Sequence, residues 1–283
     1  MKRLILSTLT AAILGVSAAA SADNLSIGFA DPLSSLDPQL NNHAGDRSVA
    51  LHFWDLLIEN KWNKLQPGLA VSWKPLDSTT WEFKLREGVK WQDGTPFTAD
   101  DLIYSYTRAR AVPGSVATYA GYLRTIDTMT AKDPLTLIVK TKAPNPDLPL
   151  NLASVHVVSK HVGEKSTTED YNSGKAMVGT GPYKFVSYTP GDRVLMERND
   201  GYWGEKATWD KVNYRYINNA AARTAALLAG DVDVIDKVSV SDLAKLQKAP
   251  NVSVYPYDGL RVMILQPCLL YTSDAADEED SVD

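Results

Sequence analysis

Residues Trp81–Tyr106, WEFKLREGVKWQDGTPFTADDLIYSY, decide the fold of this chain. Over 81–86 apolar and charged side chains alternate, which is the period of a half-buried strand. Turn-forming residues follow at 92–96, and Thr98 with Asp101 three residues later indicates a capped helix start. The stretch therefore predicts a strand, a loop and a helix in close succession, and nothing in it indicates catalysis.

This stretch resembles the extracytoplasmic solute-binding proteins of family 5, which serve peptide, nickel and related ABC importers. The resemblance rests on many positions in fixed order. These are Gly68-Leu69-Ala70-x-Ser72-Trp73, then WxFxLRxGVKWxDGTPxTAxD over 81–101, with Leu36-Asp37-Pro38 before them and Val178-Gly179-Thr180-Gly181-Pro182-Tyr183 and Tyr202-Trp203 after them. Such a set of positions is far more specific than a single short motif.

The resemblance implies an α/β fold of the periplasmic binding protein type II-like class. In that fold a discontinuous α/β lobe is interrupted by an inserted α+β domain. On this analogy 23–44 and about 177–267 form the first lobe, and about 45–176 form the small inserted domain. The second main lobe, which supplies the opposite side of the ligand cleft, is expected to be missing.

The chain begins like a secreted protein. Lys2 and Arg3 precede an apolar run, and Ala20-Ser21-Ala22 has the small residues of a cleavage site. We therefore expect residues 1–22 to be a signal peptide and the mature protein to reside in the periplasm. No cysteine lies near the cleavage site, so lipid anchoring is not expected.

The other end of the sequence is unusual. Residues 268–283, CLLYTSDAADEEDSVD, have no counterpart in the family, and we expect a non-native disordered tail on a C-terminally truncated chain. A natural acidic tail is the alternative. Removing the two bases of 1–22 and the six acids of the tail from totals of 29 and 34 leaves 27 basic and 28 acidic residues. A nearly neutral body gives no support for nucleic-acid binding.

Local patterns predict further elements along the chain. A first strand is expected over 24–30, an amphipathic helix over 46–59, and hairpins around 132–134 and 189–192. Asn219 and Gly230 are expected to bound a helix. The last strands are expected over 251–257 and 260–266, and strand–helix alternation from 211 onward is typical of α/β wiring.

Signals for an enzyme are poor. The sequence has no nucleophile elbow, and its four histidines lack metal-ligand spacing. Its single cysteine, Cys268, lies in the expected tail and leaves the body without a thiol nucleophile. We therefore predict no catalytic residues, no metal site and no cofactor.

Ligand contacts are predicted from the resemblance. The loop after Leu36-Asp37-Pro38 would supply Asn41, Asn42, His43 and Ala44. Tyr119 and Tyr122 resemble the aromatic segment of peptide-binding relatives that reaches the cleft, with packing on a helix face as the equal alternative. Gly259, Arg261 and Met263 would line the cleft floor, where Arg261 could meet a carboxylate or simply lie on the surface.

The sequence thus predicts the periplasmic substrate-binding component of an ABC importer. Its expected ligand is a di- or oligopeptide, its partner an inner-membrane ABC permease complex, and its state a monomer that binds no nucleic acid. A carrier of nickel chelates, opines or oligosaccharides on the same scaffold is one alternative, and His43 in the first-lobe loop could touch such a chelate. A secreted hydrolase is the alternative from another class, and it lacks a nucleophile–base pair.

Overall fold

The computed structural model describes residues 24–256. These residues fall into two compact units, 24–243 and 244–256, and everything below concerns the first unit unless the second is named. The first unit contains two larger sheets and one separate hairpin. Among residues 24–256, no helix combines the length and the apolar character needed to cross a bilayer.

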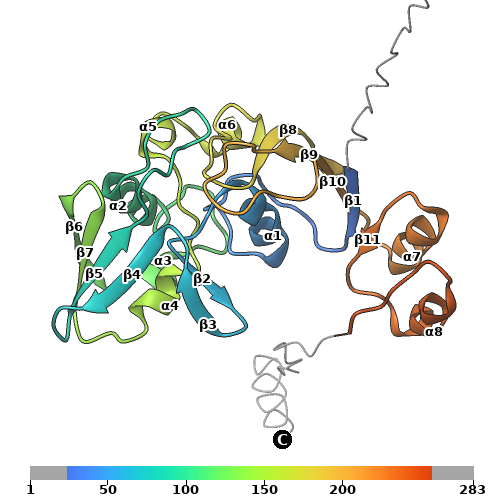
Figure 1. Cartoon of the computed structure of the whole chain (residues 1–283), viewed down its shortest axis with the longest axis horizontal. Coiled ribbons are helices and arrows are strands. Elements are labelled where there is room, and N and C mark those ends of the chain that lie inside the picture. The colour runs from blue at the N-terminus through green and yellow to red at the C-terminus, as the bar shows by residue number, and fades with distance from the viewer. Residues whose placement is uncertain (1–23, 257–283) are drawn as a thin grey trace, which may run out of the picture. The chain divides into compact units, whose positions relative to one another are not determined.

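A five-stranded mixed sheet joins the two ends of this unit (Figure 1). Strand β1 pairs in parallel with β10, so that Ile27 lies opposite Tyr214, and also in parallel with β11. The order is β11-β1-β10-β9-β8, with β1 Asn24–Phe29, β8 Tyr183–Thr189, β9 Arg193–Arg198, β10 Lys211–Tyr216 and β11 Val234–Ile235. Because β1 is separated in sequence from its partners by a second sheet, the α/β lobe is discontinuous, as expected.

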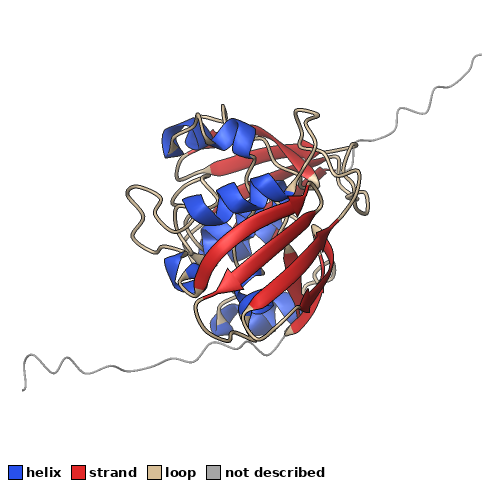
Figure 2. Ribbon diagram, turned by 90° about the vertical axis from the view of Figure 1, so that its left-hand side faces the viewer, coloured by secondary structure: helices blue, strands red, loops and turns tan. Residues whose placement is uncertain are grey.

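The inserted segment contains a four-stranded antiparallel sheet, which Figure 2 turns toward the viewer. Its order is β4-β5-β7-β6, with β4 Ala70–Pro75, β5 Thr80–Leu85, β6 Ile126–Asp133 and β7 Thr136–Thr141. Helix α2, Ala99–Arg108, packs against β6 and β7. The Asp101 carboxylate accepts the backbone N–H of Thr98 at 2.9 Å, which confirms the predicted capping box at the start of α2.

The remaining helices are short, and one of them, α7, begins and ends at predicted residues. They are α1 Ala44–Phe53, α3 Ala120–Leu123, α4 Leu148–Leu152, α5 Lys160–Gly163, α6 Thr168–Asn172, α7 Ala220–Ala229 and α8 Val240–Lys248. The Asn219 side chain accepts from the N–H of Ala222 at 2.9 Å, and Gly230 follows α7 with φ 78°. Both ends of α7 are therefore confirmed, and so are the hairpins β6–β7 and β8–β9.

The helix predicted over 46–59 is too long, because α1 ends at Phe53. Trp54 leaves the helix with extended backbone angles, and Leu56 then forms a bridge with His156. Strand β2, Ile58–Lys61, follows and pairs with β3, Lys64–Pro67. The apolar residues after Phe53 are buried by strand-like pairing with a distant segment, and this tertiary pairing overrides their helical spacing.

The strand predicted over 251–257 is wrong for residues 251–256, which form no strand. These residues belong to the second unit, which begins within α8. The strand predicted over 260–266 lies outside the described residues.

Glycines of the Val178–Tyr183 motif allow two backbones to meet. A Cβ on Gly179 would lie 1.8 Å from the carbonyl oxygen of Phe53, and a Cβ on Gly181 would lie 2.6 Å from its carbonyl carbon. The N–H of Gly181 donates to that carbonyl oxygen at 2.8 Å. The motif therefore attaches the end of α1 to the start of the β8–β10 segment, and only glycine fits there.

A candidate ligand-binding surface

The loop from Asp31 to His43 is held in shape by buried polar side chains. Asp46 on the first turn of α1 accepts from the N–H of Ser34 at 2.7 Å and also from its hydroxyl. Burial raises the pKa of Asp46, whereas the two bonds from Ser34 and the nearby His43 oppose that shift. The Ser34 hydroxyl in turn accepts from the side-chain amide of Asn41 at 3.1 Å.

The end of this loop meets the segment that carries Tyr119 and Tyr122. The backbone N–H of Asn42 donates to the carbonyl of Ala117 at 2.8 Å, and its side-chain amide donates to the hydroxyl of Tyr122 at 3.1 Å. The Tyr119 hydroxyl donates to the carbonyl of Asn41 at 3.4 Å, and the two tyrosine rings lie 6.3 Å apart. The structure thus brings together two segments separated by more than 70 residues that the sequence predicted independently as ligand-facing.

These residues do not all present surface to solvent. Asn41 is buried, and its side-chain oxygen accepts from the N–H groups of Val116 and Ala117. Tyr119 is fully buried and packs within the hydrophobic core. The groups that remain accessible are Asn42 and Tyr122, both half-buried, and the exposed His43 and Ala44.

The chemistry of this surface suits recognition by hydrogen bonds. Asn42 and Tyr122 supply polar atoms, and the guanidinium of Arg47 donates to the Asn42 side-chain oxygen at 3.2 Å. His43, with 49% of its side chain exposed, lies 3.8 Å from the Asp46 carboxylate. Among residues 24–256, no group of three or more His, Cys, Asp or Glu side chains could hold a metal ion. Gly259, Arg261 and Met263 lie outside the described residues.

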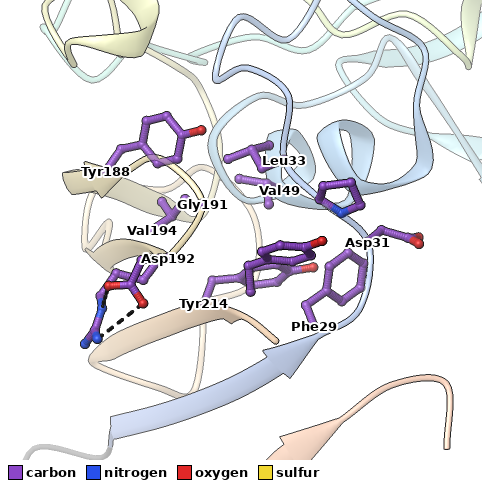
Figure 3. A pocket seen from close by; sticks show the side chains of 12 residues that line it. Phe29, Asp31, Leu33, Val49, Tyr188, Gly191, Asp192, Val194 and Tyr214 are labelled. Carbon is purple, nitrogen blue, oxygen red and sulfur yellow. Dashed lines mark hydrogen bonds and ion pairs between the residues drawn. The ribbon is translucent and has the colours of Figure 1, made fainter. Parts of the chain in front are cut away.

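A small cavity opens at the carboxyl ends of β1 and β10, close to the start of the same loop (Figure 3). Its volume is about 50 Å³, and Figure 3 shows the rings of Phe29, Tyr188 and Tyr214 around it, with Leu33 and Val49 opposite the β8–β9 turn. The carboxyl ends of parallel strands are where open α/β sheets bind ligands. No motif or pattern described in the sequence marks the residues around this cavity as ligand-binding, so the cavity was not predicted.

A groove of about 540 Å³ lies where the β2–β3 hairpin faces the loop at 202–208. The Tyr202 hydroxyl and the Trp203 indole N–H both donate to the buried Asp55 carboxylate, at 3.0 and 2.8 Å. The guanidinium of Arg86 lies 4.5 Å above the Trp203 ring. Trp203 and Arg86 belong to the motifs noted in the sequence, whereas the role of Asp55 was missed because no local pattern marks it.

Comparison with known proteins identifies this architecture. The sequence model of the bacterial extracellular solute-binding proteins, family 5, matches residues 64–267. The chain belongs to this family. The family is defined by solute binding, in agreement with the prediction of a binding protein rather than an enzyme.

Relatives and solved structures agree with the family 5 assignment. The periplasmic oligopeptide-binding protein OppA of Salmonella typhimurium is 28% identical over 90% of this chain and 53% of its own length. The OppA structure from Burkholderia pseudomallei superposes with a TM-score of 0.72 at 25% identity, over 81% of this chain and 49% of that one. The structure of MoaA from A. tumefaciens R10 in complex with mannopinic acid gives 0.73 at 27%, over 81% and 48%. The family 5 chain spans about half the length of the curated relatives it matches, and its fold is of the periplasmic binding protein type II-like class.

Proposed function

We propose that this chain is part of the periplasmic substrate-binding component of an ABC importer, and that its ligand is a di- or oligopeptide. Membership of family 5 supports the binding role, and the names of the oligopeptide-binding relatives support the ligand class. One observation carries the proposal to particular residues. Asn42 makes direct contacts with Ala117 and Tyr122, which brings the accessible Asn42, His43 and Ala44 together with the accessible Tyr122.

The proposed mechanism is binding without turnover. A peptide carrier must accept varied side chains, so affinity should come from groups common to all peptides, namely backbone amides, carbonyls and charged termini. Asn42, Tyr122 and the backbone of His43 and Ala44 offer such hydrogen-bonding groups. This chain would supply one side of a two-lobed clamp, because its relatives are about twice as long, and closure on the ligand would create the form delivered to the permease.

The remaining predictions form part of the same proposal. The protein would reside in the periplasm after loss of residues 1–22, act as a monomer and deliver its ligand to an inner-membrane permease complex. Residues 23–44 and 177–267 would form the first lobe, and 45–176 the inserted domain. Gly259, Arg261 and Met263 would complete the cleft floor.

An opine carrier is the second candidate, because the MoaA complex with mannopinic acid superposes as well as the peptide-binding structures do. The two candidates differ in the ligand they retain. The purified protein, expressed from the longest reading frame that contains this chain, is incubated with a mixture of short peptides and, separately, with mannopinic acid. Native mass spectrometry then identifies what stays bound. We expect an intact peptide, whereas retention of the opine alone, or cleaved peptides, would overturn the proposal.

A further inference from the structure

The loop that presents Asn42, His43 and Ala44 is attached through buried charges to the inserted segment. Arg108, at the last residue of α2, donates to both carboxylate oxygens of Asp37, at 2.9 and 2.5 Å. The hydroxyl of Thr168 donates to the same carboxylate at 2.7 Å. The Asp37 side chain is fully buried and that of Arg108 is 12% exposed, so the pair is enclosed by protein.

The same guanidinium also fixes the next polar residue of the loop. Arg108 donates to the side-chain oxygen of Gln39 at 3.1 Å, and the Gln39 amide donates to the backbone carbonyls of Ser105 and His156. Gln39 is completely buried. The guanidinium lies 5.1 Å from the ring centre of Tyr171, which limits its movement on another side.

A two-pronged contact of this kind specifies geometry more than it adds stability. A pair of apolar side chains could fill the same space, but apolar packing would let the loop slide relative to α2. A guanidinium and a carboxylate form two parallel hydrogen bonds in one geometry, which fixes the position of the loop. Burial opposes the charge on Arg108, but the Asp37 carboxylate raises the pKa of Arg108 overall. In the sequence, only Leu40 and Asn41 lie between Gln39, which Arg108 also contacts, and the accessible Asn42.

We propose that Arg108 is a positioning residue for ligand binding. Through Asp37 and Gln39 it sets the place of the loop whose accessible groups are Asn42, His43 and Ala44. The inserted segment contributes Arg108, Thr168 and Tyr171. Through the position of the loop, these side chains affect the affinity for a ligand that they do not contact. This inference rests on the proposed function, because it names how the ligand-facing surface is held.

The test compares three variants with the wild-type protein. Arg108→Lys keeps the charge but loses the two-pronged contact. The double variant Arg108→Met with Asp37→Asn removes both charges, which avoids leaving one buried and unpaired. Arg198→Met is the matched control, because Arg198 is also a partly buried arginine paired with two carboxylates, Asp200 and Asp210, and it lies outside the loop.

Peptide affinity is measured by calorimetry with the peptide that the wild-type protein retains. We expect Arg108→Lys and the double variant to weaken binding by about tenfold, and Arg198→Met to change it by less than about twofold. Hydrogen exchange at the Asn42 amide should accelerate in the Arg108 variants and not in the control. The double variant is decisive because it separates fold stability from loop position. If Arg108 only stabilises the fold, a double variant with the melting temperature of the wild-type protein should also bind peptide with wild-type affinity.

Two outcomes count against different statements. If the wild-type protein binds peptide and the double variant binds it equally well, with unchanged exchange at Asn42, the positioning role is overturned and the proposed function stands. If the wild-type protein retains no peptide at all, the proposed function fails and takes this inference with it.

Discussion

Two of the contacts that join the inserted segment to the rest of the first unit handle buried charge in opposite ways. In the Arg108 attachment, which comprises Asp37, Gln39, Arg108 and Thr168, a carboxylate is paired with a cation. In the Asp55 attachment, which comprises Asp55, Tyr202 and Trp203, the carboxylate accepts only from neutral groups of the opposite segment. Within residues 24–256, no basic side chain forms an ion pair with Asp55.

This difference predicts where the stability of the protein responds most to mutation and where it responds to pH. A paired charge keeps its ionisation but depends strongly on its partner. An unpaired buried carboxylate is penalised by desolvation, and burial accordingly raises the pKa of Asp55, against the opposing hydrogen bonds from Trp203, Thr180 and Tyr202. We therefore expect the largest single-residue effects at the first attachment and a proton-linked response near the second.

The largest effect should come from breaking the paired attachment. Asp37→Ala leaves the Arg108 guanidinium buried without its carboxylate, and we expect the free energy of unfolding to fall by about 3–5 kcal/mol. Urea denaturation followed by circular dichroism measures it. A loss below about 1 kcal/mol would show that the pair is solvated in solution and would remove the contrast between the two attachments.

The next effect concerns the backbone contact beside Asp55. Gly179→Ala places a Cβ against the carbonyl oxygen of Phe53, so α1 or the glycine motif must shift, and we expect a loss of about 3 kcal/mol. Gly121→Ala is the matched control, because a Cβ there meets nothing within 4 Å and the residue lies in α3. The control should be neutral or more stable by up to about 1 kcal/mol. Equal losses in the two variants would contradict the close approach.

His156 lies between the two attachments and should give the pH response. Its carbonyl accepts from Gln39, and its ring nitrogen Nδ1 lies 3.3 Å from the carbonyl of Trp54. Burial, and secondarily the charge of Arg47, lowers the pKa of His156 to about 4, from 6.5 for an exposed histidine. The folded state thus binds the proton less readily than the unfolded state. Stability is fully present above pH 6.5 and falls as pH drops toward 4, by up to about 3 kcal/mol.

Denaturation of the wild-type protein and of His156→Gln at pH 7, 6, 5 and 4.5 checks this. The variant should show a flatter dependence of stability on pH than the wild-type protein. His52 is the internal comparison, since burial also lowers its pKa to about 4, and His52→Gln should remove a share of the same slope. Identical slopes in the wild-type protein and both variants would contradict the assignment.

The smallest effect is expected at the unpaired carboxylate itself. Asp55→Asn keeps the shape of the side chain but replaces one carboxylate oxygen with an amide NH2 group, which donates rather than accepts. Either Tyr202 or Trp203 therefore loses its hydrogen-bond acceptor. We expect a loss of about 1–3 kcal/mol at pH 7, measured by thermal and urea denaturation. Burial raises the pKa of Asp55, so the wild-type protein loses stability as pH rises from 3.8, the ordinary value of an aspartate, through the raised folded pKa. The loss caused by Asp55→Asn, which does not titrate, should therefore shrink over that rise in pH. A loss equal to that of Asp37→Ala would show that the two attachments do not differ.

Local sequence patterns correctly predicted the helix boundaries that are set by neighbouring residues. Thr98 with Asp101, and Asn219 with Gly230, bound their helices as expected because caps act within one turn of the residues that form them. The β2–β3 hairpin was missed because its turn residues, Trp62 and Asn63, take positive φ values of 55° and 60° without a glycine.

Contacts between distant segments were beyond local patterns. The resemblance indicated Asn42 and Tyr122 separately, but their contact depends on the folded loop. The pairing of Asp37 with Arg108, and of Asp55 with Trp203, joins residues more than 70 positions apart. Asp37 and Trp203 lie in motifs that the resemblance marked, but no local pattern marks their partners Arg108 and Asp55. Those pairings required the structure.

We propose that this family 5 protein binds a peptide and leaves it intact. The most direct measurement is native mass spectrometry of the protein after incubation with a defined peptide mixture, followed by analysis of the released ligand. We expect one uncleaved peptide to be bound per protein molecule, and less peptide to be bound by Arg108→Lys. Release of shortened peptides, or a protein that retains none of the mixture, would contradict this proposal.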